Sequence, residues 1–532
     1  MWTLRIYCAL YRKFHFYNNC LNSIQRTFCY EPNNKISTLF ENVAHQEISK
    51  SQIYSVLSPL GDVIVSIDDF RILEKNLHPM NTSFWPVFLD YSTAHDYPKL
   101  RKSLTDYILK DKYEHNNATL MKTLKLLSIQ ERFTDFRSLY AELLLRLTPI
   151  EKKVFQHDFA KLLARTPFWR ETLELIPLLE INRYDISSLY GSMCLSALKF
   201  DTISSVFECM ERLIGSPHDC IFYEFFNKLH GLEEKEAVHL VSQLFQIMHK
   251  RQWIITHDVA RHIQHWFTNL KHERWVGDMH AYINRGYMCS VCNQSLPPPD
   301  MSQFPLSQMA DTFYETVIKG TNIENLYLTA TSDEVVTLKR FLDSQTEPLD
   351  CIIDFLNLMN MRRLHSFDSS GLFVAKIIRQ INKDFNLRRF CLVSKGNTIV
   401  RRPAFWNSIK MLGNQLGVSV HKFCTNAKSE DDAFLLYMAM KSGPQCYIVS
   451  NDEYNNYRYS SGPKLGEQIS RWQSLRQLVL QQHGRSIYQK PSKCDLRVHG
   501  SLETGWHIPY YSGHVKKLHT AAKSWLCLRR LE

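Results

Sequence analysis

Two adjacent carboxylates, Asp431 and Asp432, follow a strand-like apolar run at a point where the sequence predicts the start of a helix. Ser429 lies three residues before Asp432, a spacing typical of helix N-caps, and the residues that follow supply an apolar helix face. Acids at a helix start commonly interact with the helix dipole only, and for this pair alone that simpler interpretation stays open. Two anions held side by side are also a candidate binding site for a cation.

Two further carboxylates follow apolar runs that have the length and composition of buried strands. Asp354 closes the run Cys351-Ile352-Ile353, and Asp452 comes just after residues 446–450. In open α/β sheets ligands bind outside the carboxyl ends of the strands, so we expect the four acids to converge there. Hard divalent cations such as Mg²⁺ or Mn²⁺ select oxygen ligands, and a phosphodiester is the natural substrate of such a site.

A second candidate metal site begins with the pair Cys289-Ser-Val-Cys292. Two thiolates at this spacing can share a zinc ion, but a closed tetrahedral site needs two more ligands. His507 and Cys527, near the C-terminus, are the candidates. If all four converge, one structural Zn²⁺ ties the chain before the acidic domain to the chain after it. Without the distant pair, a free dithiol is an equally good interpretation.

The acids lie in a region where strands and helices are expected to alternate, which predicts a mainly parallel sheet with helices on both faces. The expected strands are Asp350–Asp354, Phe390–Ser394, Val418–Phe423 and Gln445–Ser450. The expected helices are Leu372–Lys383, Pro403–Gln415 and Asp431–Lys441. These strand ends and the start of the last helix are the elements that must position the four acids.

The chain before the cysteine pair is expected to be almost entirely helical, from about residue 48 to residue 285. Within it, Val206-Phe207 with Met210 recurs 38 residues later as Leu244-Phe245 with Met248. Period and pattern resemble the pentatricopeptide repeat, an α-solenoid unit that binds RNA. A helical array whose core positions happen to recur is the alternative interpretation.

Composition points to a polyanionic partner and a reducing compartment. The formal net charge of +11 favours a partner such as nucleic acid. The 14 cysteines lack the dense, even spacing of secreted disulfide scaffolds, so we expect most of them to be reduced thiols. No stretch approaches the run of roughly 18 apolar residues that a transmembrane helix needs, so we expect no membrane partner.

The first thirty residues contain no Asp or Glu but carry Arg5, Arg12, Lys13 and Arg26 among apolar side chains. This composition is typical of a mitochondrial transit peptide and predicts import into the matrix. The segment departs from the usual pattern because it is rich in aromatic residues and poor in serine. A secretory signal fits less well, since the first two arginines leave too short an apolar core.

Several of these stretches, in this order, resemble the protein-only RNase P family, and in particular its animal mitochondrial branch. They span residues 289–527 and comprise Cys289-x₂-Cys292, Ile352–Asn357, Ser429–Leu436, Val449–Glu453, Trp472-Gln473, Trp506–Tyr510 and Trp525–Cys527. The resemblance implies an α plus α/β multidomain protein with an N-terminal α-solenoid, a split zinc-binding domain and a Rossmann-like α/β metallonuclease domain of the NYN/PIN-like type.

The implied domains follow from this resemblance. Residues 1–45 would be a transit peptide and N-terminal segment, and residues 46–283 a pentatricopeptide-like repeat domain. Residues 284–340 and 495–532 would be the two parts of the zinc-binding domain, on either side of a metallonuclease domain at 341–494.

The resemblance also implies an activity: a metal-dependent endoribonuclease that removes the 5′ leader from precursor tRNA and leaves a 5′ phosphate and a 3′ hydroxyl. Asp354, Asp431, Asp432 and Asp452 would be its catalytic, Mg²⁺- or Mn²⁺-binding acids. In the animal mitochondrial branch it further implies two partner proteins, a tRNA methyltransferase and a short-chain dehydrogenase, which help to order the nuclease.

Three loop cations, Lys395, Arg401 and Arg402, are candidate phosphate contacts, although such cations are more often merely solvated. Two departures from the family pattern predict weakened metal binding. Phe355 stands where a small residue is usual, and its ring is expected to crowd the strand end. Asn456-Tyr457 replaces the usual Asp-His.

Two other functions remain open on the sequence alone. The first is a non-catalytic RNA-binding scaffold whose degraded nuclease domain only docks tRNA. The second is an endonuclease of the same catalytic fold that acts on messenger or ribosomal RNA. The presence of all four acids argues against the first function, and the repeat and zinc motifs argue against the second.

Overall fold

The structure, a computed structural model, describes residues 50–57, 61–76, 84–179, 183–213, 215–284, 286–299, 304–319, 331–362, 367–396, 403–426, 431–481, 487–491, 494–511 and 524–531. The expected transit peptide, residues 1–45, lies outside these ranges. The chain divides into two compact units, Met1–Ile150 and Glu151–Glu532. Among the described residues, no helix combines the length and the apolar character needed to cross a bilayer.

The described part of the first unit is helical. Its helices are α3 (Lys50–Leu57), α4 (Ile67–Asn76), α5 (Phe84–Ala94), α6 (Pro98–Lys110), the short η2 (Lys112–Glu114), α7 (Asn117–Ile129) and α8 (Phe133–Arg146). Buried aromatic rings hold three of them together: the Tyr107 ring of α6 lies 5.1 Å from Phe70 of α4 and 5.2 Å from Trp85 of α5, between centroids. The N-terminus of α7 is capped by Asn116, whose side chain accepts a hydrogen bond from the Thr119 backbone N–H.

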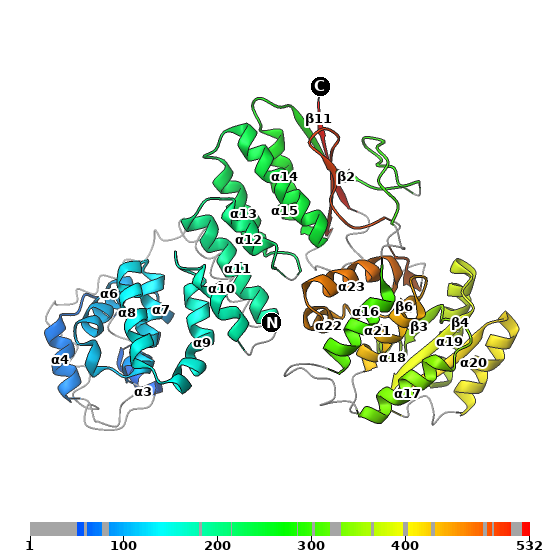
Figure 1. Ribbon diagram of the computed structural model, residues 1–532, viewed down its shortest axis with the longest axis horizontal. Coiled ribbons are helices and arrows are strands. Elements are labelled where there is room, and N and C mark those ends of the chain that lie inside the picture. Colours follow the sequence, from blue (N-terminus) through cyan, green and yellow to red (C-terminus); the bar gives the residue numbers. More distant parts are fainter. Residues whose placement is uncertain are drawn as a thin grey trace. The chain divides into compact units, whose positions relative to one another are not determined.

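The second unit begins with further helices, several of them paired as hairpins (Figure 1). They are α9 (Pro149–Leu163, which starts at the unit boundary), α10 (Glu171–Leu175), η3 (Ile176–Leu178), α11 (Arg183–Phe200), α12 (Ser205–Met210), α13 (Asp219–Leu229), α14 (Glu234–Arg251) and α15 (His257–Thr268). Val206 and Met210 of α12 are buried, as are their counterparts Leu244 and Met248 of α14. The third recurring residue differs, since Phe207 is half-buried and Phe245 is buried. The recurrence thus falls mainly on core residues, and the pentatricopeptide repeat stays a prediction.

A small five-stranded sheet packs against the last of these helices. It has the order β1-β10-β11-β2, with β9 paired to β10. The strands are β1 (Ile255–Thr256), β2 (Trp275–Ala281), β9 (His499–Ser501), β10 (Gly505–Tyr511) and β11 (Trp525–Arg530). One side of this sheet packs on the preceding helices; for example, the Trp506 ring lies 5.1 Å from the Phe245 ring of α14, between centroids. Strands 250 residues apart in sequence thus share one core.

A six-stranded sheet has the order β5-β4-β3-β6-β7-β8, parallel except for β8. Its strands are β3 (Cys351–Asp354), β4 (Arg389–Lys395), β5 (Ser419–Thr425), β6 (Tyr447–Val449), β7 (Gln477–Leu480) and β8 (Tyr488–Gln489). The first four agree with the predicted strands to within two residues at each end. The helices are α16 (Leu306–Phe313), the π-helical η5 (Tyr314–Ile318), α17 (Ser332–Asp343), α18 (Phe355–Arg362), α19 (Phe367–Phe385), α20 (Pro403–Leu416), α21 (Asp431–Ser442), α22 (Asn455–Ser460) and α23 (Pro463–Arg476).

Both faces of the six-stranded sheet are covered by helices, as the alternating pattern predicted (Figure 1). Ile352 of β3 faces a core formed with α16, α21 and α23, whereas its neighbours Cys351 and Ile353 face a core formed with α19 and α20. Successive strand residues point to opposite faces, so one apolar run supplies both cores.

The packing departs from the expected domain boundaries at residues 284 and 341. Strand β2, at Trp275–Ala281, pairs with β11 and so extends the small sheet before residue 284. Helices α16 and α17 belong to the core of the six-stranded sheet rather than to the small one. The sequence WVGDMHA of β2 has no continuous apolar run, which is why a purely helical pattern was expected there.

Candidate functional site

The strand order reverses between β3 and β6. From β3 the chain proceeds outward through β4 and β5, and then returns to place β6 on the other side of β3. Such a reversal opens a crevice at the carboxyl ends of the two central strands, which is where ligands bind in open α/β sheets. Asp354 is the last residue of β3, and Asp452 follows the end of β6 by three residues. The fold therefore places both at this point.

Asp354 is held in one orientation by its neighbours. Its side chain is only 3% exposed. Its Oδ1 accepts a hydrogen bond from the Asn357 backbone N–H at 2.9 Å, and its Oδ2 accepts from the Asn357 amide and from Ser450 Oγ, the latter at 3.1 Å. Burial raises the pKa of Asp354 above its ordinary value, and the nearby charge of Asp431 acts in the same direction, whereas these hydrogen bonds oppose the rise. A bound cation would favour the charged form.

Asp431 and Asp432 occupy the first turn of α21 and are half-buried. The electrostatic interaction between Asp431 and Asp354 shows that the helix start and the end of β3 are near each other. Their expected N-cap, Ser429, lies outside the described residues, so the cap stays a prediction. The eight residues from Ala433 to Met440 are all buried, and this helix is therefore fixed firmly against the sheet.

The turn that carries Asp452 is anchored by side chains of neighbouring segments. The Asp452 backbone N–H donates to Ser450 Oγ at 3.0 Å, and Asp452 Oδ1 accepts from the Tyr454 N–H at 3.2 Å. Gln477, the first residue of β7, donates its amide to the carbonyl oxygens of Ser450 and Asp452 at 2.9 and 2.8 Å. The backbone around Asp452 is therefore tied to two adjacent strands.

The buried side chain of Tyr454 lies near three of the four acids. Its side chain is 2% exposed, and its backbone has a φ of +52°, a left-handed conformation that is uncommon for a bulky residue. Burial raises the pKa of the Tyr454 hydroxyl well above its ordinary value, and the charges of Asp354, Asp432 and Asp452 raise it further. All three acids are therefore within electrostatic reach of one buried hydroxyl. Tyr454, Ser450 and Gln477 could not be predicted from the sequence, since none of them belongs to a metal-ligand pattern.

The four acids surround the strand ends without closing on one another. In the described part of the chain, they are not among the groups of three or more ligand atoms gathered tightly enough to hold an ion. Uncompensated carboxylates repel one another, which opposes a tight cluster of the four oxygens. The arrangement is one in which a divalent cation would have to draw the oxygens inward.

The structure describes some of the other residues predicted to lie near this site and leaves out others. Lys395 is the last residue of β4, next to the strand that ends in Asp354. Arg401 and Arg402 lie outside the described residues. The expectation that Phe355 crowds the strand end is wrong: its ring is 1% exposed and packs in the core, 5.5 Å from the ring of Phe405 of α20, between centroids. The start of α18 turns this side chain away from the crevice.

The cysteine pair and its distant partners come together as the zinc pattern predicted. Cys289 and Cys292 lie in the turn after β2, while His507 of β10 is directly opposite Cys527 of β11 in the small sheet. One ligand atom from each of the four residues lies within 4.8 Å of the others, and Cys292 Sγ is 3.1 Å from His507 Nε2. This Cys₃His group could hold a metal ion.

The protonation of this group suits a metal ligand set. A hydrogen bond from the Cys527 thiol, aided by one from His507, lowers the pKa of Cys289 to about 3, although burial opposes this. The same shared proton, together with burial, raises the pKa of Cys527. A deprotonated Cys289 would suit a metal ligand, and a bound cation would replace the shared proton. Four donors of this kind, with no position left open, match a closed structural zinc site.

Comparison with known proteins agrees with the resemblance seen in the sequence. Residues 283–527, which contain both candidate metal sites, match the family model described as Protein-only RNase P. The mitochondrial ribonuclease P catalytic subunits of Rattus norvegicus and Mus musculus are each 23% identical over 372 residues, which is 68% of this chain. The matching region spans 61% of the length of each of these relatives.

A solved structure supports the same fold. The crystal structure of nuclear proteinaceous RNase P 2 from A. thaliana covers 85% of this chain and 100% of its own, with a TM-score of 0.50 and 13% sequence identity. At this identity the likeness concerns the fold alone. The family resemblance stated from the sequence is thus confirmed by the family match and by these relatives.

Proposed function

We propose that this chain, a relative of the protein-only RNase P proteins, is a metal-dependent endoribonuclease that removes the 5′ leader from mitochondrial precursor tRNA. The observation that carries this proposal is the position of four acids around the strand-order reversal, within the region that matches the family. Carboxylates at this point of an α/β sheet suit the binding of a divalent cation and a phosphodiester.

Asp354, Asp431, Asp432 and Asp452 would hold Mg²⁺ or Mn²⁺, since their oxygen donors suit these ions. When bound, the cation would lower the pKa of a water molecule and stabilise negative charge on the leaving 3′ oxygen. The products would be a 5′ phosphate on the tRNA and a 3′ hydroxyl on the leader.

The chain's own residues orient these acids before any substrate arrives. Asn357 and Ser450 hold the Asp354 carboxylate, and Gln477 holds the backbone that carries Asp452. Orientation by such fixed hydrogen bonds reduces the reorganisation needed during the reaction. Lys395, at the end of the neighbouring strand, would contact a phosphate beside the scissile bond.

The other parts of the chain would bind and place the tRNA. The helical hairpins would act as pentatricopeptide-like repeats, and the net charge of +11 favours a polyanionic ligand. The Cys₃His group would carry one structural Zn²⁺ that fixes the cysteine turn to the C-terminal strands. The repeat domain, the split zinc-binding domain and the nuclease domain would follow each other in the order implied by the resemblance.

The cellular setting is part of the same proposal. The curated relatives are named as mitochondrial catalytic subunits, which supports a mitochondrial location, and we extend this to the matrix. We further propose that a tRNA methyltransferase subunit and a short-chain dehydrogenase subunit assist cleavage. Such partners could help the cation to bring the four acids together.

The test is single-turnover cleavage of a leader-bearing precursor tRNA in Mg²⁺, with and without the two partner proteins. We expect one cut at the mature 5′ end and a 5′ phosphate on the product. Leader-free unstructured RNA serves as the competing substrate. Binding of precursor tRNA without any cut, under all metal and partner conditions, would instead support an RNA-binding scaffold. Equal cleavage of unstructured RNA would support an endonuclease of other substrates.

A further inference from the structure

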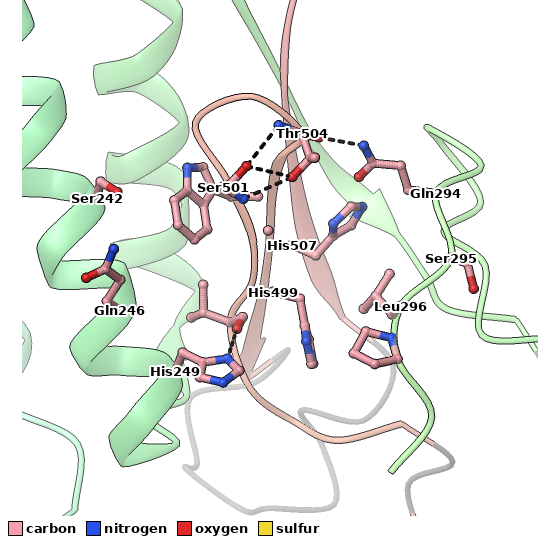
Figure 2. A pocket seen from close by; sticks show the side chains of 14 residues that line it. Ser242, Gln246, His249, Gln294, Ser295, Leu296, His499, Ser501, Thr504 and His507 are labelled. Atoms are coloured by element: carbon pink, nitrogen blue, oxygen red, sulfur yellow. Dashed lines mark hydrogen bonds between the residues drawn. The ribbon is translucent and has the colours of Figure 1, made fainter. Parts of the chain in front are cut away.

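A pocket of about 620 Å³ lies beside the Cys₃His group, between α14 and the segment β9–β10 (Figure 2). Figure 2 shows Gln246 and His249 on the helix and His499 on the strand segment, with His507 on the side of Gln294. Strand β9 needs glycine at position 500, where φ is +124° and a Cβ would lie 1.9 Å from the Gly505 carbonyl oxygen. The volume is within the range of roughly 300–1,000 Å³ that small-molecule sites occupy.

The lining of this pocket combines polar and apolar side chains and carries no carboxylate, ammonium or guanidinium group. None of the residues that line it is an Asp, Glu, Lys or Arg. A phosphate, a carboxylate or an ammonium group would therefore meet no side chain of opposite charge in it. A neutral ligand with several hydrogen-bonding atoms fits this lining best.

Two imidazole rings in the pocket have their tautomers fixed by backbone carbonyls. His249 Nδ1 donates to the Val498 carbonyl oxygen at 2.5 Å, and burial lowers the pKa of His249, so the ring is neutral and Nε2 carries a lone pair. His499 Nε2 donates to the Asp495 carbonyl oxygen at 3.1 Å, which leaves Nδ1 as its acceptor. The ring centroids are 5.7 Å apart. Two neighbouring residues of the pocket lining thus each keep one acceptor nitrogen.

The pocket also offers a donor and flat apolar surfaces. Trp506 is 3% exposed, and its indole Nε1–H has no acceptor among the described residues. The rings of Trp506 and His499, together with Leu296 and Pro297, supply surfaces against which a planar ring can pack. Stacking on aromatic side chains, combined with hydrogen bonds to the ring edge, is how proteins recognise unpaired bases of RNA.

We propose that this pocket binds one unpaired nucleobase of an RNA, with a preference for bases that carry an exocyclic amino group. An amino group has two N–H donors, one for each imidazole acceptor, and the indole N–H can donate to a ring nitrogen or a carbonyl oxygen of the base. Uracil lacks the amino group, and its single ring N–H could pair with only one of the two imidazole acceptors, at a cost in affinity. The proposal rests on the proposed function only in taking RNA as the ligand.

The probes are the four free nucleosides, each titrated into the zinc-loaded full chain and followed by saturation-transfer NMR. We expect adenosine, cytidine and guanosine to bind at least tenfold more tightly than uridine. Gln246→Trp should abolish this binding, because Gln246 lies exposed at the rim of the pocket and the indole would fill the mouth. Gln243→Trp, on the same helix but outside the pocket, should leave binding unchanged.

Zinc content and melting temperature are measured for both variants to check that they fold. If Gln246→Trp is unstable, Ser295→Trp, at the opposite rim of the pocket, takes its place. The proposal is overturned if no nucleoside binds at millimolar concentration, if uridine binds as tightly as the others, or if blocked and control variants bind equally. Leader cleavage is assayed separately. Cleavage without nucleoside binding would remove the pocket proposal alone, while binding without cleavage would remove the proposed nuclease function alone.

Discussion

Ser450 connects the two central strand ends, because its Oγ donates to Asp354 Oδ2 at 3.1 Å and accepts from the Asp452 backbone N–H at 3.0 Å. One hydroxyl thus holds a carboxylate that closes β3 and the backbone that follows β6. Removal of this hydroxyl would leave both acids less well oriented, and would raise the pKa of Asp354 further.

Ser450→Ala should therefore lower cleavage by about tenfold, the scale of one hydrogen bond to a charged group, and raise the Mg²⁺ concentration needed for half-maximal rate. A Mg²⁺ titration of the single-turnover rate measures both effects. The control is Ser442→Ala, which removes a hydroxyl bonded to the Met438 carbonyl oxygen at the far end of α21. An unchanged Mg²⁺ requirement in Ser450→Ala would show that this hydroxyl does not orient the site.

Asp431→Asn and Asp432→Asn should each lower cleavage by about 100-fold or more, because each removes a negative charge expected to hold the cation. Binding of precursor tRNA, measured in Ca²⁺, should persist or tighten, since affinity for RNA comes mainly from cationic surfaces and shape. Raised Mn²⁺ should restore part of the rate. Asp311→Asn is the control, since it removes an exposed acid paired with Lys441 at the other end of α21. Cleavage at the wild-type rate in both aspartate variants would leave the pair with a helix-start role only.

The strands of the six-stranded sheet could be predicted from the sequence because each is a short apolar run that supplies two buried faces. The convergence of His507 and Cys527 on the cysteine pair could be predicted because Cys289 and Cys292 supply only two of the four donors of a closed site. The positions of the acids followed from one rule, that the carboxyl ends of parallel strands share an edge.

The supporting contacts could not be predicted in the same way. Gln477 and Ser450 reach the acid site through hydrogen bonds whose partners depend on strand order, which no local pattern encodes. Phe355 was misplaced because the first turn of α18 rotates its ring into the core. Strand β2 was missed because its pairing with β11 joins segments about half the chain apart, and its own residues alternate only weakly.

Cys289→Ser should release zinc and destabilise the second unit, because a closed site of this kind contributes directly to folding. We expect zinc content below stoichiometric and a melting temperature lower by about 5 °C or more. Mass spectrometry of bound metal and calorimetry measure the two. Cys424→Ser, a half-buried cysteine of β5 outside the Cys₃His group, is the control. Full zinc content and normal melting in Cys289→Ser would remove Cys289 from the ligand set.

A largely buried ion pair joins helix α14 to helix α23 and gives the chain a predictable pH dependence. Arg251, at the end of α14, contacts Glu467 of α23 and also donates to the Leu213 carbonyl oxygen. Burial raises the pKa of Glu467 to about 7, although the charge of Arg251 acts to lower it. Glu467 therefore binds its proton more tightly in the folded chain than in the unfolded chain.

The contribution of Glu467 to the free energy of unfolding is therefore complete below the ordinary glutamate pKa and is lost as the pH rises through about 7. The amount lost is no more than roughly 3 kcal/mol. Glu467→Gln mimics the protonated acid, so its stability should match the wild type at pH 5 and exceed it at pH 8. Urea unfolding at both pH values measures the difference, with the exposed Glu503→Gln as a control that should show no such divergence. The opposite result would be a Glu467→Gln variant that is less stable than the wild type, with a larger deficit at pH 8 than at pH 5. In that case the ion pair with Arg251 would outweigh burial, and the pKa of Glu467 would lie below its ordinary value.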